Sequence, residues 1–289
     1  MVRRLNHLGY SERRACATVG LDRSTYMRHK YRVPSNREIR QLLLEDAVRD
    51  IHERSRGTYG MLRIRAALEI EQGIVVNKKL VWKIMRRLGL KGLPGPRKGV
   101  KNLVNASTCE DLVERNFVAR RPNELWLTDI TEHPTAEGKL YCCCVLDLFS
   151  RKVVGWAIDR HCDSALVNDA LTMASDSRET EATVIHSDHG SQFTSWAFTQ
   201  NVHRLGLVPS MGTVGDCYDN APMESFWGSV QIELFNRQRW STKVELANAI
   251  ADYLENFYNT ERRHSSLGYL TPNEFEVLHS VQPTQAKLP

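Results

Sequence analysis

The 289-residue sequence has no long hydrophobic run. No apolar segment approaches the roughly 18 residues that a membrane-spanning helix needs, and the N-terminal residues are not followed by the hydrophobic stretch of a signal peptide. Hydrophobic residues make up 42% and charged residues 25% of the chain, which excludes a disordered or collagen-like protein. We therefore expect a cytoplasmic protein with no membrane partner, long enough for about two domains.

The sequence has no two cysteines with the C-x-x-C spacing. The seven cysteines therefore provide neither a zinc ribbon nor a thioredoxin motif. Three of them are consecutive within the apolar run 140–146, where they act as small hydrophobic residues of a buried strand. A reduced, cytosolic protein fits this pattern best.

Acidic residues are missing from one long stretch, since none occurs between positions 72 and 109. Residues 1–100 contain 23 Lys and Arg against 9 Asp and Glu, a net charge of +14, whereas residues 101–289 have a net charge of −9. A basic region of this kind favours a polyanionic partner such as nucleic acid. The acidic remainder either serves solubility or contains carboxylates with a chemical role.

Two helix pairs are predicted in the basic part. In residues 11–28, a short helix, a turn at Gly20 and a second helix capped by Asp22 or Ser24 resemble a small helix-turn-helix. In residues 59–90, Asn77 is placed to cap a helix that Gly89 ends. The predicted apolar face of that helix consists of Leu80, Val81, Ile84 and Leu88, and the basic face consists of Lys78, Lys79, Lys83, Arg86 and Arg87. We expect the basic face to contact DNA phosphates, the alternative being a solvated surface.

The rest of the chain predicts an α/β domain. Three β-rich runs at 124–131, 139–149 and 152–158 suggest an antiparallel meander, and alternating helices and strands follow, with a long helix that opens after Asn220. We predict a basic helical DNA-binding region at 1–90, a linker at 91–121, a catalytic core at 122–240, a C-terminal helical extension at 241–281 and a disordered tail at 282–289.

Three carboxylates stand out by position. Asp129 lies in an apolar strand, where a charge is costly unless it is paired or binds a metal. Asp188 follows the fourth strand, and Glu224 lies one turn into a helix at the edge of its apolar face. Each has an alternative role: a strand-end turn for Asp129, an Asx-turn for Asp188, and pairing with the helix dipole for Glu224. Together they have the chemistry that magnesium-dependent phosphoryl transfer needs.

At these residues the sequence resembles the second-frame (OrfB) transposases of bacterial insertion sequences, whose catalytic core is similar to retroviral integrases. Thirty-five residues separate Asp188 from Glu224, as in the DD(35)E signature of that family. The matching segments are residues 126–131, 145–156, 186–195, 219–226 and 258–268, followed by Thr271-Pro272.

The resemblance implies a ribonuclease-H-like, mixed five-stranded sheet flanked by helices and preceded by the helix-turn-helix region. It also implies that Asp129, Asp188 and Glu224 are catalytic residues that bind two Mg²⁺ ions, for which Mn²⁺ substitutes. The expected reaction is cleavage at the 3′ end of the insertion sequence, followed by strand transfer. The expected partners are DNA at the element ends and the target, further copies of the chain, and the product of an upstream frame, in the bacterial cytoplasm at the nucleoid.

Some residues leave alternatives open. His186 and His189 flank Asp188 and could suggest zinc, but no cysteine pair is near. Arg262 and Arg263 follow a helix in a predicted loop, where they either contact DNA backbone phosphates or form ordinary surface charge. The alternative functions are a catalytically inactive DNA-binding repressor of the element and a ribonuclease-H-type nuclease.

Overall fold

The computed structural model describes residues 1–94, 119–188, 190–211 and 221–280. Most of the predicted linker, the predicted tail, His189, Cys109 and Cys217 lie outside these residues. The chain divides into two compact units at Arg49 and Asp50, a boundary that falls inside one helix.

The first unit contains three short helices, α1 (Val2–His7), α2 (Glu12–Val19) and α3 (Arg23–Lys30), and most of α4 (Asn36–Arg54). Gly20 ends α2 in the left-handed conformation at φ 67°, and the Asp22 side chain caps α3 by accepting a hydrogen bond from the Thr25 N–H at 3.0 Å. The predicted helix pair is therefore confirmed. Its small core consists of Val2, Ala15, Cys16 and Tyr26.

The second unit begins with the end of α4, followed by α5 (Met61–Gln72) and α6 (Lys78–Leu88). The Asn77 side chain caps α6 by accepting a hydrogen bond from the Lys79 N–H at 2.8 Å, and Gly89 ends the helix at φ 71°, as predicted. The apolar face of α6 differs at one position. Leu80 is 41% exposed, and Met85 is buried beside Val81 and Ile84 instead. The prediction for Leu80 was wrong because the buried stripe at i, i+3 and i+4 starts from Val81, which leaves Leu80 at its edge.

A mixed five-stranded sheet forms the centre of the second unit, in the order β3-β2-β1-β4-β5. Its strands are β1 (Leu125–Thr135), β2 (Gly138–Asp147), β3 (Val153–Asp159), β4 (Val184–Ser187) and β5 (Val208–Met211). The first three pair antiparallel, whereas β4 pairs parallel with both β1 and β5. The predicted meander and sheet class are confirmed. Cys142, Cys143 and Cys144 are buried in β2, also as predicted.

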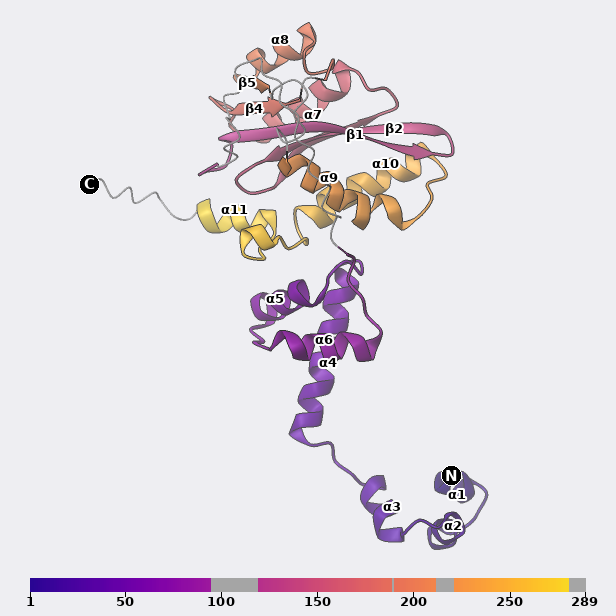
Figure 1. The fold of residues 1–289 in the computed structure, drawn as a ribbon. Helices are drawn as coiled ribbons and strands as arrows, with labels where there is room; N and C mark the ends of the chain where they lie inside the picture. The colour runs from indigo at the N-terminus through magenta and orange to yellow at the C-terminus, as the bar shows by residue number, and fades with distance from the viewer. Residues whose placement is uncertain (95–118, 189, 212–220, 281–289) are drawn as a thin grey trace, which may run out of the picture. The chain divides into compact units, whose positions relative to one another are not determined.

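Helices cover both faces of the sheet (Figure 1). α7 (Ser164–Asp176) and α8 (Trp196–Arg204) share one hydrophobic cluster with Trp126, Cys143 and Val145 of the strands. On the other face, α9 (Ala221–Glu233) and α10 (Lys243–Asp252) share a cluster with Leu125 and Leu127. Because side chains alternate along a strand, every second residue of β1 points toward α9.

β3 and α7 approach each other closely at Gly155. A Cβ atom at this position would lie 2.2 Å from the carbonyl oxygen of Ala170 and 2.7 Å from the Cβ of Ala174. Only a glycine fits a contact this short. The glycine of the Val-Val-Gly-Trp segment is thus explained by packing between the sheet and α7.

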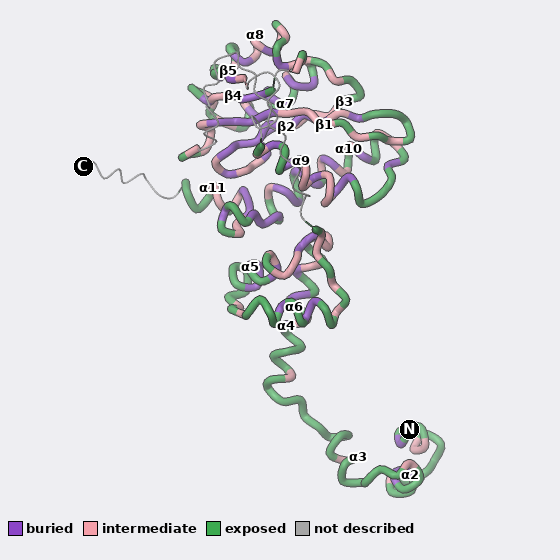
Figure 2. Tube along the Cα trace, in the orientation of Figure 1, coloured by how far each residue is buried: buried purple, intermediate pink, exposed green. Residues whose placement is uncertain are grey.

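The C-terminal part contains η1 (Phe235–Arg237), α10, the π-helix η2 (Tyr253–Tyr258), η3 (Ser265–Leu267) and α11 (Pro272–Ser280). Leu246, Ile250 and Tyr253 of α10 and η2 are buried in the same cluster as α9, so this segment completes one face of the sheet core. Figure 2 shows the buried strands between these helices. No helix among the described residues is long and apolar enough to cross a membrane.

Candidate active site

Asp129 lies in the central strand β1, opposite Cys144 of β2. It alternates with Leu125 and Leu127, which pack in the cluster that contains α9, so its side chain belongs to the α9 face of the sheet. The carboxylate is half-buried and accepts a hydrogen bond from the N–H of Ile130 at 2.8 Å. The strand thus holds the acid at a defined place on the sheet.

Asp188 directly follows β4, which is parallel to β1 with Leu127 in register with His186. Asp129 lies two residues after Leu127, and Asp188 lies two residues after His186. The register of the two strands therefore brings the two acids to neighbouring positions. Asp188 is exposed and accepts a hydrogen bond from the Gly190 N–H at 3.0 Å, which is the Asx-turn considered for it. This turn does not exclude a second role, because a carboxylate has two oxygens and several lone pairs.

The His186 side chain is buried and contacts β5. It is 1% exposed, and its Nδ1 lies 3.1 Å from the Ser210 hydroxyl of β5. His189, the other histidine of the zinc alternative, lies outside the described residues. His186 is thus an internal residue of the β4–β5 pair.

Glu224 lies in the first turn of α9. The spacing predicts a buried face of Met223, Phe226, Trp227 and Val230; Met223, Phe226 and Val230 are buried, Trp227 is partly buried against the same cluster, and Glu224 itself is exposed. The apolar stripe fixes the rotation of α9 on the sheet and leaves Glu224 at the edge of the contact, on the face to which Asp129 belongs.

Electrostatics link the three acids. Burial raises the pKa of Asp129 to about 6, and the negative charges of Asp188 and Glu224 add to this rise. Asp188 and Glu224 therefore each lie close enough to Asp129 to disfavour its ionised form. Within the described residues, no group of three or more His, Cys, Asp or Glu side chains is arranged so that it could already hold a metal ion.

The donor set nevertheless fits a divalent cation. Mg²⁺ and Mn²⁺ prefer hard oxygen ligands, and all three residues are carboxylates. A cation among them would remove the mutual repulsion that raises the pKa of Asp129. The side chains that would hold it are Asp129, Asp188 and Glu224.

The basic face of α6 is exposed along the whole helix. Lys78, Lys79, Lys83, Arg86 and Arg87 are all exposed, as shown for this region in Figure 2. The guanidinium group of Arg86 stacks over the Trp82 ring at 5.4 Å, and Trp82 is itself 48% exposed. The helix therefore combines cationic and aromatic side chains on its outer surface, as nucleic-acid-binding surfaces often do.

Comparison with known proteins identifies these regions. The model of the integrase core domain matches residues 119–217, a second integrase core model matches 205–272, and that of an HTH-like domain matches 38–98. The chain is 35% identical to the transposase for insertion sequence element IS904 of Lactococcus lactis, over 86% of this chain and all of that protein. It is 34% identical to the transposase InsF for insertion sequence IS3A of Escherichia coli, over 92% of this chain and 94% of that protein.

The chain belongs to the insertion-sequence transposases. Its central domain is an integrase core, and its function is DNA transposition. The ribonuclease-H-like sheet expected from the resemblance agrees with the observed strand order. A solved structure, the HTLV-2 integrase catalytic core domain in complex with magnesium, has a TM-score of 0.42 and 18% identity, over 55% of this chain and 99% of that chain.

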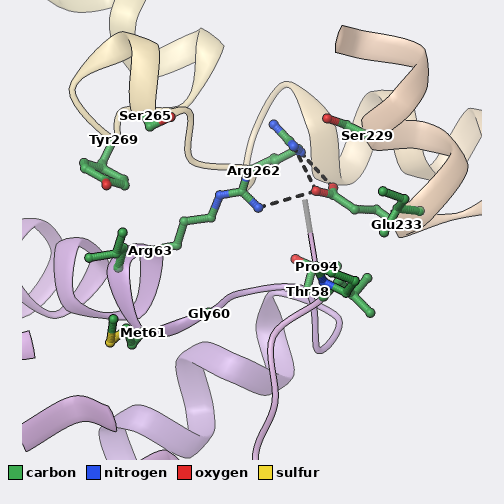
Figure 3. A pocket seen from close by; sticks show the side chains of 13 residues that line it. Thr58, Gly60, Met61, Arg63, Pro94, Ser229, Glu233, Arg262, Ser265 and Tyr269 are labelled. Carbon is green, nitrogen blue, oxygen red and sulfur yellow. Dashed lines mark hydrogen bonds and ion pairs between the residues drawn. The ribbon is translucent and has the colours of Figure 1, made fainter. Parts of the chain in front are cut away.

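Two predicted DNA contacts of the transposase have a different environment from the one expected. Arg262 and Arg263 are each only 4% exposed. Arg262 forms two hydrogen bonds to Glu233 of α9, at 2.7 and 2.8 Å, and Figure 3 shows the side chains of Arg262 and Arg63 both pointing toward Glu233. Arg263 donates two hydrogen bonds to Glu71 of α5, at 2.8 and 3.2 Å. Both arginines therefore pair with carboxylates of the protein and are not ordinary surface charge, whereas their contact with DNA stays a prediction.

The same segment joins α5 to the catalytic core. The Tyr59 hydroxyl donates a hydrogen bond to the carbonyl oxygen of Glu261 and accepts one from the N–H of Arg263, both at 2.7 Å. Arg63 of α5 lies 3.4 Å from Glu233. The sequence contains no local signal for these contacts, because the partners are about 170 to 200 residues apart. Arg151 was also missed: it lies inside a motif that matches the family, but its neighbours in the fold come from distant segments.

Proposed function

We propose that Asp129, Asp188 and Glu224 are the catalytic carboxylates of this transposase and that together they hold two Mg²⁺ ions, or Mn²⁺ in their place. The observation that supports this most directly is the parallel register of β1 and β4, which pairs Leu127 with His186 and so brings Asp129 and Asp188 to neighbouring positions. The charges of Asp188 and Glu224 also add to the rise in the pKa of Asp129 that burial causes. Three acids from β1, the end of β4 and α9 thus share one region, although the chain segments that supply them are far apart in sequence.

In this proposal Asp129, Asp188 and Glu224 would hold the ions, and the Lewis acidity of these ions would favour the deprotonated form of a water or a 3′-hydroxyl and the negative charge on the leaving oxygen of the phosphodiester. The chain supplies the geometry. β1 fixes Asp129 between apolar neighbours, and the Asx-turn of Asp188 uses one carboxylate oxygen and leaves the other available. Glu224 projects from the exposed edge of a helix whose other side is anchored in the core. The reaction nicks the 3′ end of the element and joins that end to another strand.

DNA is the proposed partner of the basic face of α6, through Lys78, Lys79, Lys83, Arg86 and Arg87. Their exposure and the HTH-like domain over residues 38–98 support this assignment. We further propose that several copies assemble on paired element ends, that an upstream-frame product joins or binds the chain, and that the protein acts in the bacterial cytoplasm at the nucleoid.

A strand-transfer assay tests the catalytic proposal. The full-length chain is incubated with Mg²⁺ and a labelled duplex that carries one end of the element. We expect both nicked and joined products for the wild type and a loss of about 10²- to 10³-fold for D188N, because removal of a single electrostatic group at a reaction centre costs this much. D169N, which changes an exposed carboxylate of α7 on the opposite face of the sheet, is the matched control and should keep full activity.

Each other outcome has a distinct meaning. Full joining activity of D188N would show that the proposed mechanism is wrong. Nicking without joining by the wild type would favour a ribonuclease-H-type nuclease. DNA binding without either product would favour a repressor of the element.

A further inference from the structure

A cavity of about 500 Å³ lies beside the first turn of α9. Ala221, Pro222 and Ser225 form one wall, so the cavity and Glu224 share the same helical turn. Leu146 of β2 lies at its base, opposite Leu127 in the sheet register, two residues before Asp129. The cavity is therefore next to the candidate active site but contains none of its three carboxylates.

The polar groups around this cavity are cationic or neutral. Arg63, Arg151, Arg262 and His264 line it, together with the hydroxyl groups of four serines. Among the residues that the structure describes, no Asp or Glu belongs to the lining. A cavity whose donors come from guanidinium and hydroxyl groups is suited to an anion with several oxygens.

The three arginines differ in how their charge is balanced. Arg262 is held by Glu233 at 2.7 Å, and Arg63 lies 3.4 Å from the same carboxylate. Arg151, in the turn between β2 and β3, has no hydrogen bond or ion pair within the described part of the chain. It is half-buried at the cavity wall. Of the three arginines, Arg151 is thus the one whose charge is not balanced by a carboxylate of the described residues.

The positive charges around the cavity repel one another. Burial lowers the pKa of Arg63 below its ordinary value, and the charge of Arg262 lowers it further. Burial, followed by the charges of Arg262, Arg63 and Arg151, holds the pKa of His264 well below its usual range. The imidazole is therefore neutral at pH 7 and can donate or accept a hydrogen bond. An anion in this cavity would relieve the mutual repulsion of the arginines.

We infer that this cavity binds a backbone phosphate of the DNA strand that enters the active site, with Arg151 as the principal contact and Ser266 at the rim. A phosphodiester carries one negative charge and two free oxygens, which suits one unpaired guanidinium surrounded by hydroxyl groups. Since the cavity and Glu224 share the first turn of α9, the phosphate held there would position the strand for cleavage. This inference rests on the proposed function.

DNA binding without catalysis tests the inference. The full-length chain is titrated in EDTA with a fluorescein-labelled duplex of one element end, and fluorescence anisotropy is recorded at several salt concentrations. We expect R151Q to bind about tenfold more weakly and to reduce the slope of log K against log salt by about 0.7 to 0.9, the contribution of one phosphate. R151K keeps the charge and should restore most of the slope.

The matched control is R204Q. Arg204 is an exposed arginine at the end of α8, on the opposite face of the sheet, and its guanidinium contacts Asn201 of its own helix. It should leave the slope unchanged. If R204Q and R151Q shift the slope equally, the effect comes from overall charge and the inference is overturned.

A second variant covers the case in which R151Q fails to fold. S266D places a carboxylate at the exposed rim without changing the core, and it should also weaken DNA binding. Where R151Q folds, a scan with single neutral methylphosphonates locates the contact: one position near the cleavage site should weaken binding by the wild type but have no further effect in R151Q. Equal sensitivity of the two proteins at every position would contradict the inference.

The two proposals can fail separately. A wild-type chain that binds the duplex with the full slope but neither nicks nor joins it in Mg²⁺ contradicts the proposed function and leaves the phosphate site standing. A chain that nicks and joins normally, with the same binding in R151Q as in the wild type, contradicts only the phosphate site.

Discussion

At the scale of single residues, Asp129 shows what an acid in an apolar strand costs the fold. Its ionised form loses hydration and is repelled by Asp188 and Glu224, and for this reason its pKa rises from 3.8 to about 6. The folded chain therefore binds a proton that the unfolded chain releases between these two pH values. The direction of this difference determines how stability depends on pH.

We predict that metal-free wild-type protein loses stability as the pH rises from about 4 to about 6 and that the loss is complete above the folded pKa. A difference of about two pKa units corresponds to about 3 kcal/mol. D129N cannot ionise and should not share this loss. Urea unfolding in EDTA at pH 4 and pH 7 measures the effect as the stability of D129N relative to the wild type. An equal change with pH in both proteins, with D169N as control, would disprove the assignment.

The sequence was sufficient to select the three acids as candidates, whose catalytic role stays a prediction, but not to predict the environment of Arg262 and Arg263. The acids could be found because each lies in a short motif, and the spacing between Asp188 and Glu224 is fixed along the chain. The two arginines are buried because Glu233 and Glu71 face them in the fold, at separations of 29 and 192 residues. An ion pair between such distant residues leaves no local pattern in a single sequence.

At the scale of elements, the ends of helices could be predicted from nearby residues, whereas the buried face of a helix could be predicted less accurately. Asn77, Gly89, Gly20 and Asp22 cap helices as predicted because capping depends on nearby backbone groups. Leu80 was misplaced because the contacts made by the whole helix decide which side is buried. The π-helix η2 was not predicted, since π-helices lack a distinctive sequence pattern.

We predict that G155A destabilises the packing of α7 on β3 by about 2 to 4 kcal/mol, since its Cβ would overlap the backbone of Ala170. Thermal unfolding followed by circular dichroism measures the loss. G60A is the matched control, because a Cβ at Gly60 meets nothing within 4 Å and its φ of −85° suits any residue. A G155A protein as stable as G60A would show that α7 can move away from the sheet without cost.

We also predict that the double variant K79Q/K83Q lowers the slope of log K against log salt for duplex DNA by about 2, since each phosphate contact contributes about 0.9. The control R204Q/R239Q removes two exposed charges from the catalytic core and should leave the slope nearly unchanged. Affinities measured by filter binding between 50 and 300 mM salt provide the comparison. A flat slope for the wild type would rule out phosphate contact by α6.

At the scale of the whole molecule, the helical region and the catalytic core were predicted as separate domains, with a linker between them. Within the unit that begins at Asp50, however, α5 and the sheet domain share buried contacts, with Tyr59 at their centre. Burial raises the pKa of Tyr59 to about 12, so its hydroxyl stays protonated and donates to Glu261 at every physiological pH. Composition alone could not reveal this, because the charge change near residue 100 marks a difference in function rather than a break in packing.

We predict that Y59F lowers the free energy of unfolding by about 2 kcal/mol, because it leaves the buried N–H of Arg263 without its partner and removes the donor to the part-buried carbonyl of Glu261. Y141F, whose hydroxyl makes no hydrogen bond to any described residue, is the control. Urea denaturation compares the two. If both variants are equally stable, the hydroxyl of Tyr59 does not hold α5 to the core.

The two hydrogen bonds of Tyr59 also fix the distance between the helical segment that contains α5 and α6 and the sheet that contains the carboxylates. If α6 binds the duplex and the carboxylates cleave it, the distance between the binding site and the cleavage site is set by protein contacts and not by the DNA. Each base pair adds about 3.4 Å along the helix axis. A rigid connection in the protein therefore fixes the number of base pairs between the bound site and the cleaved site. The terminal sequence could then change between the two contacts, provided that its length stayed the same.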